Sequence, residues 1–155
     1  MLTGILTLFP SAGLAMVIHE LGHLLAARSC QVPASEVGLG LGPRVITFQL
    51  GGVRFSLRAL PIVSYVLLDG TVLEERRVSQ QLLVHLGGIL LNLVFGLLAY
   101  DTYFGLMNLL LAGSNLLPAY QHDGWKCAIV IMRSMLQRRS VPVERVFTYS
   151  GGFIS

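Results

Sequence analysis

The feature that most constrains this chain is a charge-free apolar segment at its start, because a segment of this length can cross a membrane. No charged residue occurs from Leu2 to Ile18, and the apolar pattern continues to Ala27. Comparable runs cover residues 82–100 and 102–120. Since about 20 helical residues cross the hydrocarbon core of a bilayer, the sequence predicts spanning helices at about 2–27, 82–100 and 102–120. A secretory signal peptide is disfavoured because residues 1–8 contain no Lys or Arg.

The composition supports the same fold class. Only 12% of the 155 residues are charged, whereas soluble domains carry about 25%, which argues against a soluble globular protein and against a disordered one. The two cysteines, Cys30 and Cys127, lie far apart and form no CxxC motif, so neither a disulfide framework nor a thiolate metal site is indicated. We therefore expect an α-helical polytopic membrane protein, with residues 1–155 forming a single membrane-embedded core.

The segment between the first two spans has a different pattern. Residues 53–58 alternate apolar and polar with the period of a half-exposed strand. Gly51 and Gly52 separate them from a second run at 45–50, and such a Gly-Gly pair is typical of a hairpin. The sequence predicts a small β-hairpin or sheet over about 36–66, on or dipping into the cytoplasmic membrane surface. The alternative is an irregular amphipathic loop.

The basic residues indicate the orientation in the membrane. The N-terminus and the turn between spans two and three have no Lys or Arg. All the basic residues follow span one or span three: Arg28, Arg44, Arg54, Arg58, Arg76, Arg77, Lys126, Arg133, Arg138, Arg139 and Arg145. The positive-inside rule makes that side cytoplasmic. These residues form no basic run interleaved with aromatic residues, so nucleic acid is not an expected partner, whereas the lipid bilayer is. Segment 124–155 is predicted to be cytoplasmic, and residues 150–155 resemble the beginning of another span, so a truncated core is one interpretation.

His19-Glu20-Leu21-Gly22-His23 is an HExxH motif inside the first span. Residues four apart share a helix face, so both imidazoles can bind one zinc ion. Glu20 would lie beside the open position of the metal and could accept a proton from a water molecule there. Ionisable residues within a spanning segment are costly and are functional by default. The alternative is that these residues lie at a fraying helix end in the membrane interface.

Two histidines leave a catalytic zinc site one protein ligand short. The candidates in this chain are Asp69, Glu74, Glu75, His85, Asp101, His122 and Asp123. Asp101 is expected on the opposite face of the membrane. Asp123 follows the third span on the cytoplasmic side, and Pro118 and Gly124 are expected to break the helix around it, as is tolerated where backbone lines a buried cavity. The alternative is that Asp123 only caps a following helix.

The HELGH segment together with Asn-Leu-Leu-Pro-Ala-Tyr-Gln-His-Asp-Gly at 115–124 resembles the site-2 protease family of intramembrane zinc metalloproteases. The resemblance extends over about residues 15–130 and includes 41–44, 57–61 and 88–92. It implies that His19, His23 and Asp123 are the zinc ligands and that Glu20 is the catalytic base. It also implies that Asn92 is an active-site asparagine that steadies the substrate or the developing oxyanion.

Three departures from the family pattern stand out. The family has an apolar residue before the Asp and a second Gly after Asp-Gly, where this chain has His122 and Trp125. The family sequence Pro-x-Gly-Gly-Tyr is replaced by a segment with Val63 and Ser64, which puts in doubt the tight bend that two glycines allow. His122 is a possible competing ligand, although adjacent residues rarely both reach one metal ion.

The resulting functional prediction is a multi-pass zinc metalloendopeptidase whose active site lies toward the cytoplasm. Its substrate would be another transmembrane protein, cut within or near its spanning segment in regulated intramembrane proteolysis. A strand from 45–58 is expected to hold the unwound substrate by edge addition. The alternatives are a catalytically inactive homologue that binds membrane helices, and a non-proteolytic zinc-binding membrane protein such as a transporter or metal sensor. Glu20 distinguishes the last alternative, because zinc binding alone requires no base.

Overall fold

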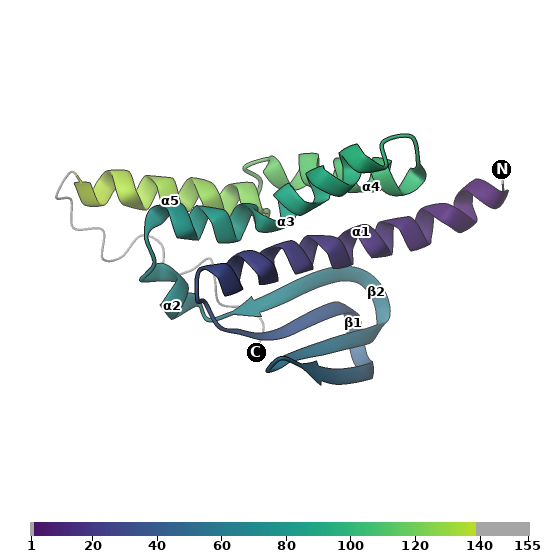
Figure 1. Cartoon of the computed structure of the whole chain (residues 1–155), viewed down its shortest axis with the longest axis horizontal. Helices are drawn as coiled ribbons and strands as arrows, with labels where there is room; N and C mark the ends of the chain where they lie inside the picture. Colours follow the sequence, from purple (N-terminus) through teal and green to yellow (C-terminus); the bar gives the residue numbers. More distant parts are fainter. Residues whose placement is uncertain (1, 139–155) are drawn as a thin grey trace.

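The computed structural model describes residues 2–138, and these form helices with a small antiparallel sheet. The elements in chain order are α1 (Leu2–Ser29), β1 (Ala34–Leu50), β2 (Val53–Leu68), α2 (Gly70–Glu74), α3 (Val78–Leu98), α4 (Tyr103–Leu116) and α5 (Asp123–Arg138). Helix α1 runs along the molecule, with the sheet on one side and α3, α4 and α5 on the other (Figure 1). The centre of α1 therefore contacts every layer of the fold.

Among the described residues, two helices are long and apolar enough to cross a membrane, namely α1 over Thr7–Ser29 and α3. They coincide closely with the first two predicted spans. Helix α4 has 14 residues, fewer than the roughly 20 that cross a bilayer, because it ends at Leu116 rather than near residue 120. Leu117 is extended, with φ −64° and ψ 138°, as expected for a residue that precedes proline. The third span thus stays a prediction. Of the predicted cytoplasmic segment 124–155, residues 139–155 lie outside the described part of the chain.

The predicted hairpin is present, with strands longer than expected. Gly51 and Gly52 have φ of 58° and 79°, and positive φ at both central residues is the signature of a type I′ turn. Residues 46–50 pair with 53–57 across this turn. Residues 36–39 each have two partners, one in 54–57 and one in 64–67. The long hairpin therefore folds back on itself, and residues 64–67 form an outer edge of the sheet.

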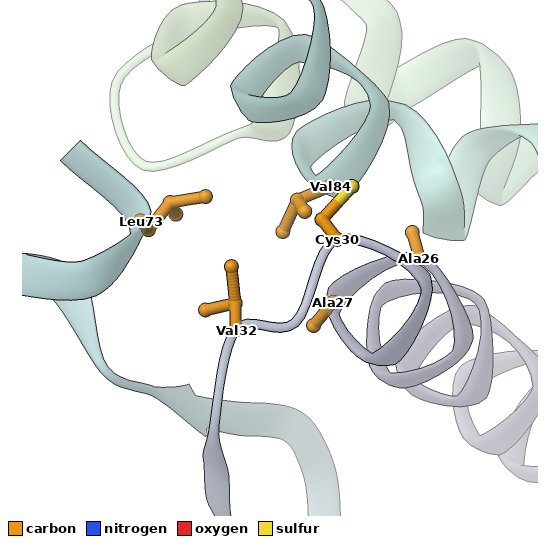
Figure 2. Close-up of a cluster of buried hydrophobic side chains, with 6 residues drawn as sticks. All are labelled: Ala26, Ala27, Cys30, Val32, Leu73 and Val84. Carbon is orange, nitrogen blue, oxygen red and sulfur yellow. The ribbon is translucent and has the colours of Figure 1, made fainter. Parts of the chain in front are cut away.

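Two apolar clusters hold the sheet and the helices against α1. One lies where α1 ends and consists of Ala26, Ala27, Cys30, Val32, Leu73 and Val84, which converge from α1, the following turn, α2 and α3 (Figure 2). The other is formed by Leu24, Val37 and Val53 between α1 and the sheet. Both clusters include residues of α1 that lie within about two turns of His23, so they pack next to the HELGH segment.

Helices α1 and α3 approach each other through glycine. A Cβ on Gly22 would collide with the carbonyl oxygen of Gly87, and a Cβ on Gly87 would lie 2.8 Å from the Cβ of Ala26. Small residues at a helix interface let the two backbones come close. This close approach brings α3 directly alongside the two histidines of α1.

Candidate metal centre

Three side chains distant in the sequence meet at one point. Asp123 Oδ2 lies 3.0 Å from His19 Nε2 and 3.0 Å from His23 Nε2, and the two imidazole nitrogens are 3.1 Å apart. All three residues are buried, and their ligand atoms could hold a metal ion. The two histidines come from adjacent turns of α1, and the aspartate comes from the first residue of α5. The fold thus brings together the three residues that the sequence indicated as ligands.

The hydrogen bonding around these atoms suits a cation. His23 Nδ1 lies 2.8 Å from the carbonyl oxygen of Val84, which can only accept, so Nδ1 carries the proton and neutral His23 presents a lone pair at Nε2. That lone pair and the carboxylate oxygen of Asp123 are 3.0 Å apart. A divalent cation among the three atoms would satisfy all of them at once, and two imidazole nitrogens with a carboxylate oxygen are ligands that zinc accepts.

Space for an ion beside the imidazoles depends on Gly88 of α3. A Cβ at this position would lie 2.6 Å from His23 Nε2 and 2.7 Å from His19 Nδ1. Any larger residue would therefore fill the space beside the ligand atoms. The donor set and the surrounding volume both fit a zinc ion.

Asp123 reaches the histidines because the chain turns sharply between α4 and α5. Gly124 is packed against the backbone of Leu116, where a Cβ would collide, and Gln121 has a positive φ of 70°. The prediction that Gly124 breaks a helix is wrong, because this glycine lies inside the first turn of α5. Its role is to let the start of α5 lie directly on the end of α4.

The contacts of the Asp123 carboxylate are with side chains. Oδ2 contacts both histidines, and Lys126 Nζ donates to Oδ1 at 3.0 Å. No described backbone N–H donates to it, as a helix cap would require. Burial alone would raise the pKa of Asp123, but its 3.0 Å contacts with the imidazole nitrogens of His19 and His23 and the nearby positive charge of Lys126 lower this pKa well below its usual range. The carboxylate is thus ionised, as a metal ligand must be.

Glu20 lies beside His19, His23 and Asp123, here called the metal group, in a cavity of about 390 Å³. The carboxylate is buried, and Ser64 Oγ donates a hydrogen bond of 2.7 Å to its Oε1. The cavity is lined by the metal group, by residues 64–68 of β2, and by His85, Asn115 and Lys126. A carboxylate beside a metal group in a cavity of this size can move a proton during hydrolysis.

The other candidates for the third ligand have different contacts. Asp69 caps α2 by accepting from the backbone of Val72, and Glu74 pairs with Arg133 at 2.8 Å. His122 Nδ1 lies 3.3 Å from the carbonyl oxygen of Ala119. The remaining candidates outside the metal group are Glu75 at the end of α2, Asp101 in the turn after α3, and His85, which lines the cavity.

Two asparagines near the site have different surroundings, and the role of Asn92 stays a prediction. Asn92 is fully buried, its amide atoms have no hydrogen-bond partner within the described residues, and it does not line the cavity. Asn115 does line it, and its Nδ2 donates to the carbonyl oxygen of Leu111 at 3.0 Å. Sequence reasoning overlooked Asn115, Lys126 and Ser64. The motif at 115–124 could have indicated Asn115, because it begins the same segment that supplies Asp123.

An HExxH helix with a convergent aspartate and a neighbouring glutamate carboxylate outside the ligand group defines a site of the metallopeptidase class. The comparison with protein families agrees, since the pattern of peptidase family M50 matches residues 9–105. The chain belongs to this family, which confirms the resemblance to the site-2 proteases. The matched region contains the HELGH segment and ends before Asp123, so the place of Asp123 comes from the fold.

Several bacterial proteins are similar to this chain, and each is named "Putative zinc metalloprotease". One from Fusobacterium nucleatum is 28% identical over 123 residues, which cover 66% of this chain and 36% of that protein. One from Helicobacter pylori is 32% identical over 96 residues, covering 54% of this chain and 28% of the relative. One from Synechocystis is 30% identical over 92 residues, covering 52% and 25%. The chain thus spans about a third or less of the length of these relatives.

Proposed function

We propose that this chain is the catalytic core of an intramembrane zinc metalloprotease that cleaves a peptide bond within or near a transmembrane segment of another protein. The observation behind the proposal is the convergence of His19, His23 and Asp123 within about 3 Å of one another beside the Glu20 carboxylate. Zinc binding alone requires no carboxylate in that position. Membership of a peptidase family and the two apolar helices support the same interpretation.

In this proposal His19, His23 and Asp123 would hold a zinc ion, whose Lewis acidity would polarise a carbonyl group and lower the pKa of a water molecule. Glu20 accepts the proton from the attacking water and delivers it to the leaving amide nitrogen. Val84 fixes the His23 ring through its carbonyl oxygen, and Lys126 holds the second oxygen of Asp123. Such outer contacts orient metal ligands and affect metal affinity.

An amide donor near the reacting carbonyl would stabilise the negative charge that develops there. The resemblance to the site-2 protease family implies this role for Asn92. The cavity lining favours Asn115, because its Nδ2 has a second N–H beyond the one donated to Leu111. We therefore propose Asn115 for the oxyanion role and leave Asn92 as an alternative. A larger loss of kcat in Asn115→Ala than in Asn92→Ala supports Asn115, and the reverse supports Asn92.

The substrate must be extended to expose its carbonyl groups. The hypothesis that a strand of 45–58 holds it does not fit the cavity, because none of those residues lines it. Residues 64–68 of β2 do line the cavity and form an edge that no other described strand pairs with on its outer side. Edge addition along 64–68 would place a substrate strand beside Glu20.

The membrane placement is part of the proposal. Exposed apolar side chains lie along α3, namely Leu90, Leu93, Val94, Leu97 and Leu98. Others lie in the second half of β1, namely Val45, Ile46, Phe48 and Leu50. The α3 residues recur at helical spacing and so share one face of the helix, and an exposed apolar face of this kind suits lipid. We propose a multi-pass integral membrane protein with the hairpin dipping into the bilayer and the active site toward the cytoplasm.

The test is co-expression with a panel of single-span membrane proteins, comparing the unchanged chain with Glu20→Gln. The proposal is supported if the unchanged chain cleaves at least one panel member and Glu20→Gln cleaves none. Zinc bound by both proteins with cleavage by neither would favour the non-proteolytic alternatives. The panel is chosen to vary helix-destabilising residues in the spanning segment, because an unwound segment is what an edge strand can capture.

A further inference from the structure

Ser64 stands where the family pattern has the second of two glycines. Val63 and Ser64 lie within β2, and Ser64 pairs with Leu39 of β1. Neither has a positive φ, so the strand needs no glycine at this point. This chain therefore has a hydroxyl at a position where the family pattern has no side chain.

The hydroxyl of Ser64 contacts the carboxylate at the centre of the site. Its Oγ donates to Glu20 Oε1 at 2.7 Å, a length at which an O–H···O hydrogen bond is well formed. Glu20 is 6% exposed. Among residues 2–138 no second hydrogen-bond donor to this carboxylate is found, so Ser64 fixes one oxygen and leaves Oε2 free to accept a proton.

The same residue belongs to the strand edge that lines the cavity. Ser64 begins the run 64–68 that borders the cavity, and residues 64–67 pair on their inner side with 36–39. A strand added on the outer side would hydrogen-bond to the backbone next to Ser64. The carboxylate of α1 is therefore linked by one hydrogen bond to the segment that a substrate strand would contact.

We propose that Ser64 is a positioning residue for Glu20, holding Oε1 through its hydroxyl so that Oε2 is aimed at the reacting water, and tying this orientation to the edge strand of β2. The inference rests on the proposed proteolytic function for its catalytic consequence. The hydrogen bond itself can be tested without activity. Ser64 touches neither the ligand atoms nor the scissile bond in this proposal.

The first experiment separates kcat from KM for a cleaved single-span substrate. Ser64→Ala is expected to lower kcat about tenfold, since a hydrogen bond to a charged group is lost, with KM and zinc content unchanged. Ser64→Thr keeps the hydroxyl and should restore most of kcat. Ser35→Ala is the matched control, because Ser35 belongs to the same sheet and donates only to the carbonyl oxygen of Leu67.

Unchanged kcat in Ser64→Ala would overturn the inference. Loss of zinc in Ser64→Ala, or failure of Ser64→Thr to restore kcat, would also overturn it by showing a packing role. Ser64→Gly, which places the family residue at this position, should behave like Ser64→Ala. If it matched the unchanged protein, the hydroxyl would be irrelevant to Glu20.

The second experiment reads the carboxylate directly by infrared difference spectroscopy of the purified protein. The Glu20 carboxylate band is the one lost in Glu20→Gln. It should shift in Ser64→Ala, return in Ser64→Thr, and stay in place in Ser35→Ala. A band that is identical in all Ser64 variants contradicts the inference even if no substrate is ever cleaved, whereas a shift without cleavage supports it and counts only against the proteolytic function.

Discussion

The Glu20 carboxylate can be tested apart from the ligands because it lies beside the metal group and not in it. We expect Glu20→Gln to reduce cleavage by about 10²–10⁴-fold, the usual contribution of a general base. Its zinc content should match that of the unchanged protein, because His19, His23 and Asp123 remain. Metal analysis and cleavage of the same preparation are the measurements. Loss of zinc in Glu20→Gln would make Glu20 a ligand and its assignment as the base wrong.

Asp123 is best tested by an isosteric change. As a ligand, Asp123→Asn should lose zinc and activity nearly as fully as Asp123→Ala, because a neutral amide binds a cation far more weakly than a carboxylate. As a cap, Asp123→Asn should be almost silent, since Asn caps about as well as Asp and Ala costs only about 1 kcal/mol. The measurements are the zinc affinity of each variant, which tests the ligand role, and its unfolding free energy, which tests the cap role.

His122→Ala is the matched control for this pair, because the His122 ring contacts the carbonyl oxygen of Ala119 and lies outside the metal group. We expect zinc and activity to be retained. Should His122→Ala lose the metal while Asp123→Asn keeps it, the third ligand would be His122.

Residue-scale prediction from sequence succeeded where a motif fixes geometry locally. The HELGH spacing places two imidazoles on one helix face before any tertiary structure is known. Ser64 could not be found in this way, because its contact with Glu20 spans 44 residues and depends on how a hairpin folds back. Asn92 was assigned from its position in a resembling segment, and only the packing of α3 shows that it is buried away from the cavity.

At the scale of elements, the glycine face of α3 makes room for the site. Gly88→Ala should abolish zinc binding, because its Cβ would lie 2.6 Å from His23 Nε2. The overpacking should also cost about 1–3 kcal/mol of unfolding free energy. Gly113→Ala in α4 is the control, since a Cβ there meets nothing within 4 Å. Zinc affinity of the two folded variants is the measurement, and equal affinity would contradict the proposed packing.

The hairpin contains a buried carboxylate that should make its stability depend on pH. Burial alone would raise the pKa of Glu36, but hydrogen bonds from Ser56 and Tyr65 and the charges of Arg44 and Arg54 lower it below the ordinary 4.5. A lowered carboxyl pKa stabilises the folded state above the unfolded pKa, and this contribution is lost as pH falls through the folded pKa.

We therefore expect the unfolding free energy to decrease as pH falls below about 4.5. Glu36→Gln should cost about 1–3 kcal/mol at neutral pH and should flatten this dependence. Glu75→Gln, at an exposed position after α2, serves as the control for charge alone. Parallel pH profiles for Glu36→Gln and the unchanged protein would exclude Glu36 as the source.

Element boundaries were predictable to the extent that local signals set them. The Gly-Gly pair gave the hairpin turn, and charge-free length gave α1 and α3. The predicted third helix ends too late, because the apolar run in the sequence continues to Tyr120. In the structure the extended residue before Pro118 ends α4 at Leu116. The curled sheet follows from the double pairing of 36–39, a tertiary feature that alternation within one strand does not reveal.

At the scale of the whole molecule, the positions of the basic residues and the arrangement of the helices both distinguish two opposite ends. Helix α2 and the last turns of α5 lie at one end, and the turn between α3 and α4 lies at the other, near the start of α1 (Figure 1). Arg133 of α5 pairs with Glu74 of α2 at 2.8 Å, which ties the basic segments together. A membrane crossed by α1 and α3 would separate these two ends.

This arrangement predicts the result of cysteine-accessibility labelling in intact membranes. Arg76→Cys and Arg138→Cys should be labelled from the cytoplasmic side, and Thr102→Cys, at the turn before α4, from the opposite side. The native Cys30 and Cys127 are buried, so replacing both with Ala gives a low-background control. Labelling of positions 76 and 138 from opposite sides would contradict a shared cytoplasmic end. Labelling of position 102 from the cytoplasm would mean that α3 does not cross, since Arg76 and Thr102 flank that helix.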